Sequence, residues 1–285
     1  MRTSLTRIAG NRFVGAHARL NGSLVALALL APTLVFTTPV SAGEYDFCPA
    51  ARTNANTQFV MTKRSLAPGV SLAKTTMQST RGKVDVRVLR VDLTQPGVSI
   101  TSLHGALASS HVLTSLAARR GVVAATNAMF FSLSYAAPVY PFIAGGRPMV
   151  LSSTPMRVAG VDINNLAEDG NAWLIGSVRS GAAEMPLVAV NLAAPVGLSV
   201  FTPEWGSRAV PLPSDARTRQ VVDGRIVSST GRYRTAPAGG SLLVARGDVA
   251  LRWRRALARF APVTINRAVA TDSAVPFRQA YGVGT

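Results

Sequence analysis

The sequence predicts an α+β fold with a mixed, mainly antiparallel sheet and a few packed helices. Most apolar residues fall in short runs separated by Gly, Pro, Asn and Asp, which is typical of strands joined by turns. Two stretches, His111–Arg120 and 248–260, instead repeat apolar residues at helical spacing. Hydrophobic residues make up 48% of the 285 residues and charged residues 15%, so the chain can bury one large core or two small ones.

The first 42 residues are typical of a secretory signal sequence. Four arginines precede the apolar stretch Leu24–Phe36, and Val40-Ser41-Ala42 is a small-x-small ending that predicts cleavage after Ala42. The stretch is interrupted by Pro32 and is shorter than the ~20 residues that span a bilayer. We therefore expect a secreted protein, extracellular or associated with the cell wall, with no stable membrane span after cleavage. A leader of low regularity at 43–80 and a domain at 81–285 are expected to follow.

The expected mature chain is strongly basic. Removing the signal takes four of the 30 lysines and arginines and none of the 13 acids, which leaves 26 bases, 13 acids and a net charge of +13. The arginines are scattered and accompany no nucleic-acid-binding motif, so nucleic acid is not expected as a partner. A solvated basic surface is the favoured interpretation, and attraction to anionic wall glycans or phosphate-bearing glycans is the alternative.

Neither a metal nor a cofactor is expected. The acids and histidines lack metal-ligand spacing, and the sequence contains no P-loop and no recognisable Ser-His-Asp order. Cys48 is the only cysteine, so an intrachain disulfide is excluded and stability must come from the core.

The first elements of the domain are expected to be a hairpin and a helix. The leader contains one candidate strand at Gln58–Met61. Residues 83–93 alternate apolar and charged side chains, and the chain then turns into a second strand, Val98–Leu103, which predicts an antiparallel hairpin. The helix His111–Arg120 follows, with a serine cap from Ser109 or Ser110 and Gly121 as its stop.

The end of a predicted buried strand, Val122–Thr126, is the strongest candidate for part of a binding site. It carries Asn127, Phe130 and Phe131 into a loop rich in Ser, Tyr, Pro and Gly. Because strand ends that feed loops commonly hold binding groups, we predict that these three residues bind substrate. The structural alternative is two core phenylalanines and an asparagine in a turn.

The same loop leads to Gly145-Gly146 and Arg147, ahead of a predicted strand at Met149–Leu151. A Gly-Gly pair lets backbone amides approach a ligand, or it simply turns a hairpin. We include these three residues in the predicted substrate-binding set. No Asp or Glu occurs between Leu93 and Val161, so any carboxylate of this site must come from elsewhere in the fold.

The rest of the chain is expected to be largely β with one helix. The predicted strands are 157–164, 172–178, 187–191, 198–201, 220–229 folded at Asp223-Gly224, 241–245 and 263–269, and the helix begins at Asp248. Glu168–Asn171 predicts the turn between the first two strands. The Gly-rich end, Gln279–Thr285, indicates an unfinished connection.

Four pieces, taken in order, resemble the secreted phosphodiester glycosidase family, which is related to the animal enzyme that removes a covering N-acetylglucosamine from mannose 6-phosphate. They are the strand Arg87–Leu93, the element Ala124–Phe131, the paired segments Val190–Leu192 and Phe201–Gly206, and the strand Pro237–Gly247. Ala128 stands where the family usually has Gly. The family's C-terminal half is not recognisable, so the chain is expected to be the N-terminal portion of such a protein.

The resemblance implies hydrolysis of a sugar–phosphodiester linkage on an extracellular or cell-wall glycan. Such chemistry needs cationic groups around the phosphate and an acid/base system at the anomeric carbon. Glu204 and Asp162 are the carboxylates that we predict as catalytic, with a turn or structural role open for each. The alternatives are a non-catalytic glycan-binding or surface protein and a truncated product that folds poorly.

Overall fold

The computed structural model describes residues 62–79, 82–228 and 233–283. The predicted signal sequence, Cys48 and the strand predicted at Gln58–Met61 lie outside these ranges. No helix within them is long and apolar enough to cross a membrane.

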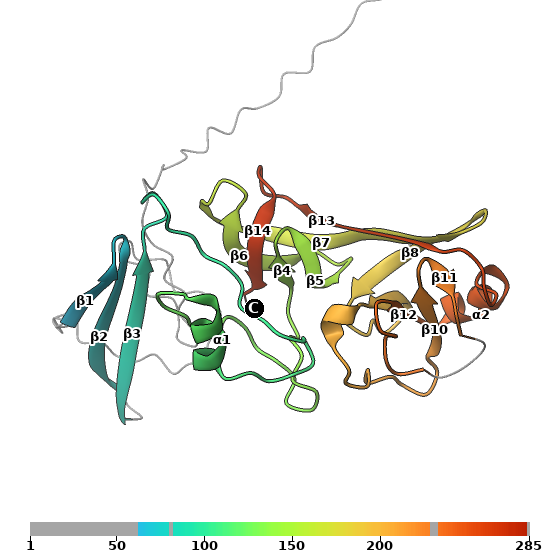
Figure 1. The fold of residues 1–285 in the computed structure, drawn as a ribbon, viewed down its shortest axis with the longest axis horizontal. Coiled ribbons are helices and arrows are strands. Elements are labelled where there is room, and N and C mark those ends of the chain that lie inside the picture. Colours follow the sequence, from blue (N-terminus) through green and yellow to red (C-terminus); the bar gives the residue numbers. More distant parts are fainter. Residues whose placement is uncertain (1–61, 80–81, 229–232, 284–285) are drawn as a thin grey trace, which may run out of the picture.

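The described part of the chain is mainly β, and the predicted α+β class with a few packed helices is wrong. It contains fourteen strands in two sheets and only two α-helices, α1 (Leu113–Arg120) and α2 (Asp248–Ala256) (Figure 1). The helices have 8 and 9 residues, and α1 buries none of its own. α1 ends at Gly121 as predicted, in the left-handed conformation, but its N-terminus has no side-chain cap. The strands therefore determine the architecture, and the two helices are peripheral additions to it.

A small antiparallel sheet at one end of the molecule comprises β1 (Thr62–Ala67), β2 (Val70–Ser79) and β3 (Gly82–Val91), in that order (Figure 1). β3 pairs with β2 along its whole length, whereas Val98–Leu103 forms no strand. The predicted hairpin and the predicted irregularity of the leader are therefore both wrong over these residues. β2 escapes sequence prediction because Ala73–Met77 does not alternate apolar and polar side chains.

The large sheet has eleven strands in the order β11-β10-β12-β9-β8-β5-β4-β14-β6-β7-β13. Their bounds are β4 Phe142–Ala144, β5 Arg147–Ser152, β6 Met156–Asp162, β7 Ala167–Ser180, β8 Ala183–Val190, β9 Gly197–Phe201, β10 Arg217–Val222, β11 Arg225–Ile226, β12 Ser241–Arg246, β13 Thr264–Thr271 and β14 Phe277–Gly282. The neighbouring strands pair antiparallel except for the parallel pair β8 and β9. β7 also pairs with β8, so that β8, β5, β4, β14, β6 and β7 form a closed ring of paired strands.

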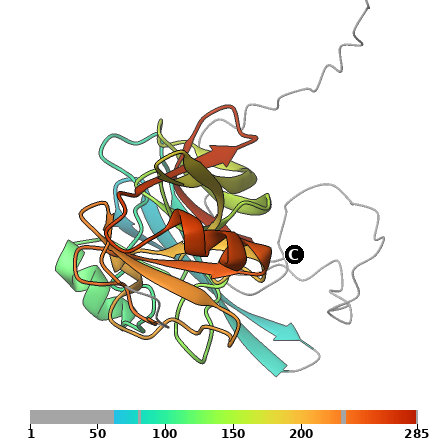
Figure 2. The same ribbon diagram turned by 90° about the vertical axis from the view of Figure 1, so that its right-hand side faces the viewer.

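The main core joins this ring to the strands around β12. Buried side chains from β4, β6, β7, β8, β9 and β12 belong to one apolar cluster. Trp253 and Leu257, at the end of α2, are fully buried in the same cluster. Figure 2 shows α2 lying across the strands at this end of the sheet. Through Trp253 and Leu257, α2 therefore covers the end of the core next to β12.

Two turn predictions have different outcomes. Asp223-Gly224 reverses the chain between β10 and β11, as predicted, and both residues have positive φ, of 47° and 67°. Glu168–Asn171 does not form a turn, because these residues lie inside β7 and pair with β6. The chain instead reverses at Ile163–Leu166, where Asn165 adopts φ 64°.

The segment predicted as an unfinished connection is a central strand. β14 pairs with β4 on one side and with β6 on the other. Its Phe277 and Ala280 are 1% and 0% exposed and belong to the main core. The strand itself was not predicted, because both partners of β14 lie far away in the sequence, where local patterns carry no information about pairing.

Candidate functional site

Glu204 stands in a 3₁₀ turn, Pro203–Trp205, that directly follows β9. The Leu107 N–H donates to the Glu204 carbonyl oxygen at 2.8 Å, and the Ala108 N–H donates to the Trp205 carbonyl oxygen at 3.0 Å. The Trp205 side chain is buried and its indole Nε1 donates to the Arg208 carbonyl oxygen at 3.0 Å. The backbone at Glu204 is therefore fixed, while its side chain keeps 26% of its surface exposed.

Arg147 is brought to Glu204 by the hairpin between β4 and β5. Gly145 and Gly146 have φ values of 58° and 71°, the left-handed pair that a two-residue hairpin requires and that glycine adopts without strain. The Gly146 N–H donates to the Arg278 carbonyl oxygen at 2.9 Å, so this amide is engaged within the fold. Arg147 Nη1 lies 3.9 Å from Glu204 Oε1, and the Arg147 side chain is 69% exposed. Two of the predicted site residues are thus neighbours.

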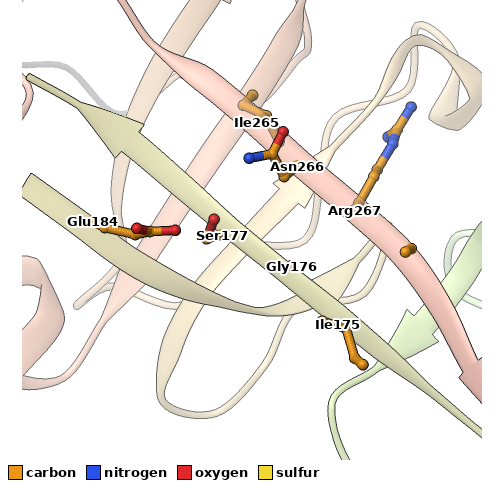
Figure 3. A pocket seen from close by; sticks show the side chains of 8 residues that line it. Ile175, Gly176, Ser177, Glu184, Ile265, Asn266 and Arg267 are labelled. Atoms are coloured by element: carbon orange, nitrogen blue, oxygen red, sulfur yellow. The ribbon is translucent and has the colours of Figure 1, made fainter.

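Arg267, in β13, is exposed to solvent, lies near enough to Glu204 and Arg147 for their charges to act on it, and was not among the predicted residues. Its two neighbours on the same face of the strand, Ile265 and Val269, pack against the main core. Arg267, Ser177 and Glu184 are among the residues that line a shallow hollow of about 600 Å³ over β7, β8 and β13, and Figure 3 shows the Arg267 side chain extending away from the other two. Burial lowers the pKa of Arg267, the Glu204 carboxylate opposes this shift, and Arg147 adds to it. An arginine at a core-facing position of a predicted strand was the signal that could have identified it.

The Glu204 carboxylate is held in its charged form. Burial pushes its pKa upward, but a hydrogen bond from the Thr202 hydroxyl, its own backbone N–H and the charges of Arg267 and Arg147 outweigh burial, so the pKa lies below its usual value. Asn191 Oδ1 lies 3.2 Å from the same Thr202 hydroxyl, so the amide and the carboxylate compete for one hydrogen. Glu204 Oε2 is buried and has no hydrogen-bond partner among the described residues.

The buried side chain of Asn191 hydrogen-bonds two segments that flank the site. Asn191 Nδ2 donates to the Met149 carbonyl oxygen at 2.7 Å and to Thr202 Oγ1 at 2.9 Å, while its Oδ1 accepts from the Thr202 N–H at 2.8 Å. Asn191 follows β8, Met149 lies in β5, and Thr202 comes two residues before Glu204. Hydrogen bonds between Asn191 and Thr202 therefore join the segments Val190–Leu192 and Phe201–Gly206, which were paired in the sequence comparison above.

Asp162, the second predicted catalytic carboxylate, serves a turn. It is 2% exposed, and its Oδ1 accepts from the Asn164 and Leu166 N–H groups, each at 2.8 Å. This pattern is the one in which an aspartate stabilises the reversal after a strand. The structure does not bring Asp162 into the group formed by Glu204 and the two arginines.

The predicted buried strand Val122–Thr126 is wrong, because these residues form a loop in which Val123 is 57% exposed. Asn127 is exposed, and Phe130 and Phe131 are 49% and 53% exposed, so the two phenylalanines are not core residues. Residues 122–126 pair with no strand, and the apolar run is therefore not buried in a sheet. The loop is nevertheless fastened to the sheet, since Met129 packs against the cluster that contains Leu107. Phe130 also lies 6.0 Å from the Tyr140 ring.

Tyr281, in β14, anchors the segment before α1. Ser102 Oγ lies 2.8 Å from the Tyr281 hydroxyl and also donates to Gln279 Oε1. The Tyr281 ring stacks on Phe142 at 5.6 Å, and His104 meets Phe142 edge-on. Burial raises the pKa of Tyr281, and the Ser102 hydrogen bond opposes this shift.

The raised pKa of Tyr281 predicts a loss of stability at alkaline pH. The stabilisation of the neutral phenol is complete below its usual pKa of 10.0 and is lost as pH rises through the higher pKa of the folded state. We expect the free energy of unfolding to decline as pH rises from 10.0 to the folded-state pKa, and to decline less in Tyr281→Phe than in a Tyr135→Phe control. Chemical denaturation across this pH range measures it, and equal declines in both variants would contradict it.

Within the described residues, no group of three or more His, Cys, Asp or Glu side chains could hold a metal ion.

No model of a known protein family matches the chain, and no curated protein matches its sequence. Two solved structures are similar in fold. A hypothetical protein from Synechocystis is 16% identical, with a TM-score of 0.63 over 79% of this chain and 44% of that protein. A protein from Burkholderia pseudomallei K96243, whose name describes it as exported, is 12% identical, with a TM-score of 0.53 over 76% of this chain and 50% of that protein. The chain thus spans about half the length of these two proteins.

Proposed function

We propose that this chain contributes the phosphate-binding part of a secreted hydrolase that cleaves a sugar–phosphodiester linkage in an extracellular or cell-wall glycan. The observation that carries the proposal is the grouping of Glu204, Arg147 and Arg267 from three separate parts of the chain. Two guanidinium groups against one carboxylate leave an excess positive charge. Guanidinium groups also match the geometry of phosphate oxygens, so an anionic ester is the ligand that this group suits best.

Each residue then has a distinct role. Arg147, exposed and only loosely paired with Glu204, turns toward the phosphate, and Arg267 adds a second positive charge to the site. Glu204, kept ionised by its lowered pKa, removes a proton from the attacking water or attacks the anomeric carbon itself. The bond between that carbon and the ester oxygen breaks, and the phosphate leaves as a monoester; where Glu204 is the nucleophile, water then hydrolyses the glycosyl ester and frees the carboxylate. Phe130 and Phe131 offer exposed rings to the apolar face of a sugar, with Asn127 beside them.

Secretion is part of the proposal. It rests on the signal-like first 42 residues, and it is supported by the fold likeness to a protein named as exported. The final location, free or bound to the cell wall, follows from the proposed glycan substrate.

The test is turnover of a chromogenic sugar phosphodiester by the full secreted chain. We expect Glu204→Gln to lower kcat/KM by at least ~100-fold, the range that loss of an acid/base group produces. Arg147→Gln should mainly raise KM, and Asn127→Ala should also lose activity. Because the Glu204 pKa lies below 4.5, the acid limb of kcat/KM should lie below that pH.

Glu184→Gln is the matched control, since Glu184 is an exposed carboxylate that pairs with Arg179 at 2.8 Å and, among the described residues, forms no hydrogen bond or ion pair with Glu204 or Arg147. This variant should retain wild-type activity. Activity of Glu204→Gln within a few-fold of that of the control would contradict the proposed role of Glu204.

One observation favours a second candidate, a glycan-binding protein without turnover. Among the described residues, the charges that act on Glu204 come from arginines, whereas most glycosidases act with two carboxyl groups. In that case the wild-type protein binds the sugar phosphodiester without cleaving it. Arg147→Gln then loses binding, while Glu204→Gln retains it.

A further inference from the structure

We propose that the small sheet formed by β1, β2 and β3 is a second binding surface, which holds the protein on a polymer of phosphodiesters such as an anionic wall glycan. The described residues of this sheet include one acid, Asp85, and six bases. The bases are Lys63, Arg64, Lys74, Lys83, Arg87 and Arg90. All six are exposed, and among residues of the sheet whose exposure is described only Val91 is buried. The sheet therefore presents its charge to solvent rather than covering a core.

Three of these bases form a row across the three strands, here called the basic row: Arg64, Lys74 and Arg87. Lys74 stands directly opposite Arg87 in the pairing of β2 with β3. Arg64 stands opposite Leu72, which shares a face of β2 with Lys74. Adjacent strands lie about 4.8 Å apart, so Lys74 and Arg87 are close neighbours, whereas Arg64 lies diagonally from Lys74 on the same face, at roughly 7–8 Å.

The basic row is an unfavourable arrangement for the folded protein alone. Like charges directly opposite each other on neighbouring strands are destabilising. Asp85, on the same face, is engaged by the Thr76 hydroxyl at 2.8 Å. Within the described ranges, none of the four salt bridges includes a residue of the basic row. A bound polyanion would supply the negative charge that this surface lacks.

A flexible phosphodiester polymer suits the basic row better than a nucleic acid does. Proteins that bind single-stranded nucleic acid combine a basic groove with aromatic side chains that stack on bases. The described residues of β1, β2 and β3 include no Phe, Tyr or Trp. The recognition available here is charge alone, and repeating phosphates on a flexible backbone can adapt to the spacing of the row.

This surface is separate from the Glu204 site. Figure 1 shows the small sheet at one end of the molecule and β12 toward the other. Tethering to a polymer and turnover at Glu204 can therefore fail independently. A protein that cleaves links in such a polymer would gain by remaining attached between events.

The experiment measures binding of the full secreted chain to a synthetic glycerol phosphate polymer of defined length, by cosedimentation between about 50 and 200 mM salt. The test variant is R64Q/K74Q/R87Q. The control is R119Q/R120Q/R252Q, which removes three exposed charges from the two helices. We expect the test variant to bind at least ~10-fold more weakly, with a slope of log K against log salt smaller by about 2, at roughly 0.7 for each lost contact. The control should bind like the wild type.

Two further measurements keep this proposal distinct from the proposed function. Turnover of a small soluble sugar phosphodiester should be unchanged in R64Q/K74Q/R87Q, and polymer binding should be unchanged in Glu204→Gln. Equal losses in test and control variants would overturn the proposal, because total charge would then explain the binding. Tighter binding of single-stranded DNA, or of phosphatidylglycerol vesicles, through the same three residues would also overturn it, in favour of that partner.

Discussion

Gly160→Ala is expected to lower the free energy of unfolding by more than about 3 kcal/mol or to prevent folding, since overpacking against immobile atoms exceeds the usual cost. Gly160 lies in β6 beside the point where the register of β14 shifts. A Cβ there would lie 1.9 Å from the Gln279 carbonyl oxygen and 2.7 Å from Ala280 Cα. Both are backbone atoms of a strand that is paired on two sides, so neither can move without disturbing the pairing of β14 with β4.

Urea unfolding followed by the fluorescence of the three tryptophans measures this effect. Gly181→Ala is the control. Gly181 turns the chain between β7 and β8 with φ 57°, and nothing lies within 4 Å of an added Cβ. It should therefore lose only the ~1 kcal/mol that the left-handed backbone costs alanine. Similar losses in both variants would mean that the contact with β14 is not the cause.

Asn191→Ala is expected to cost roughly 3 kcal/mol, because it leaves several buried polar groups without partners. The Met149 carbonyl oxygen and the Thr202 N–H and hydroxyl all lose their bonds to the amide. Asn191 is 1% exposed, so water cannot replace it without opening the core. Since Thr202 also binds Glu204, the variant should lose activity as well as stability.

Asn191→Asp separates the hydrogen bonds from the backbone conformation. Asn191 has φ 50°, which aspartate tolerates almost as well as asparagine. A carboxylate keeps the shape but cannot donate to the Met149 carbonyl oxygen, 2.7 Å away. The aspartate pKa should therefore be raised in the folded state, and the variant should recover part of its stability as pH falls and the carboxyl group gains a proton. Wild-type stability of Asn191→Asp at neutral pH would contradict this role of the network.

Local chemistry explains which parts of the fold were predictable. Gly145-Gly146 and Asp223-Gly224 turn the chain where predicted, because a two-residue hairpin needs positive φ and these residues supply it. β2 and β14 were not predictable, because their strand character comes from partners rather than from their own pattern. The strand prediction for Val122–Thr126 was wrong for the opposite reason: the pattern of these residues is typical of a strand, but they pair with no strand of the sheet.

The candidate site was predictable only in part. Glu204 and Arg147 were both selected for their chemistry, but nothing in the sequence places them 3.9 Å apart. Arg267 was visible as an arginine on the apolar face of a predicted strand, and only the pairing of β13 beside β7 brings it to the group. Asp162 was selected by the same argument as Glu204, and the hydrogen bonds of its turn distinguish the two.

The central place of β14 determines when the ring of paired strands can close. β4 and β6 are made well before β14, and their facing edges stay unpaired until Phe277–Gly282 can insert between them. Closing a sheet through contacts this distant in sequence is intrinsically slow. During synthesis from the N-terminus, the ring would therefore stay open until β14 has been made.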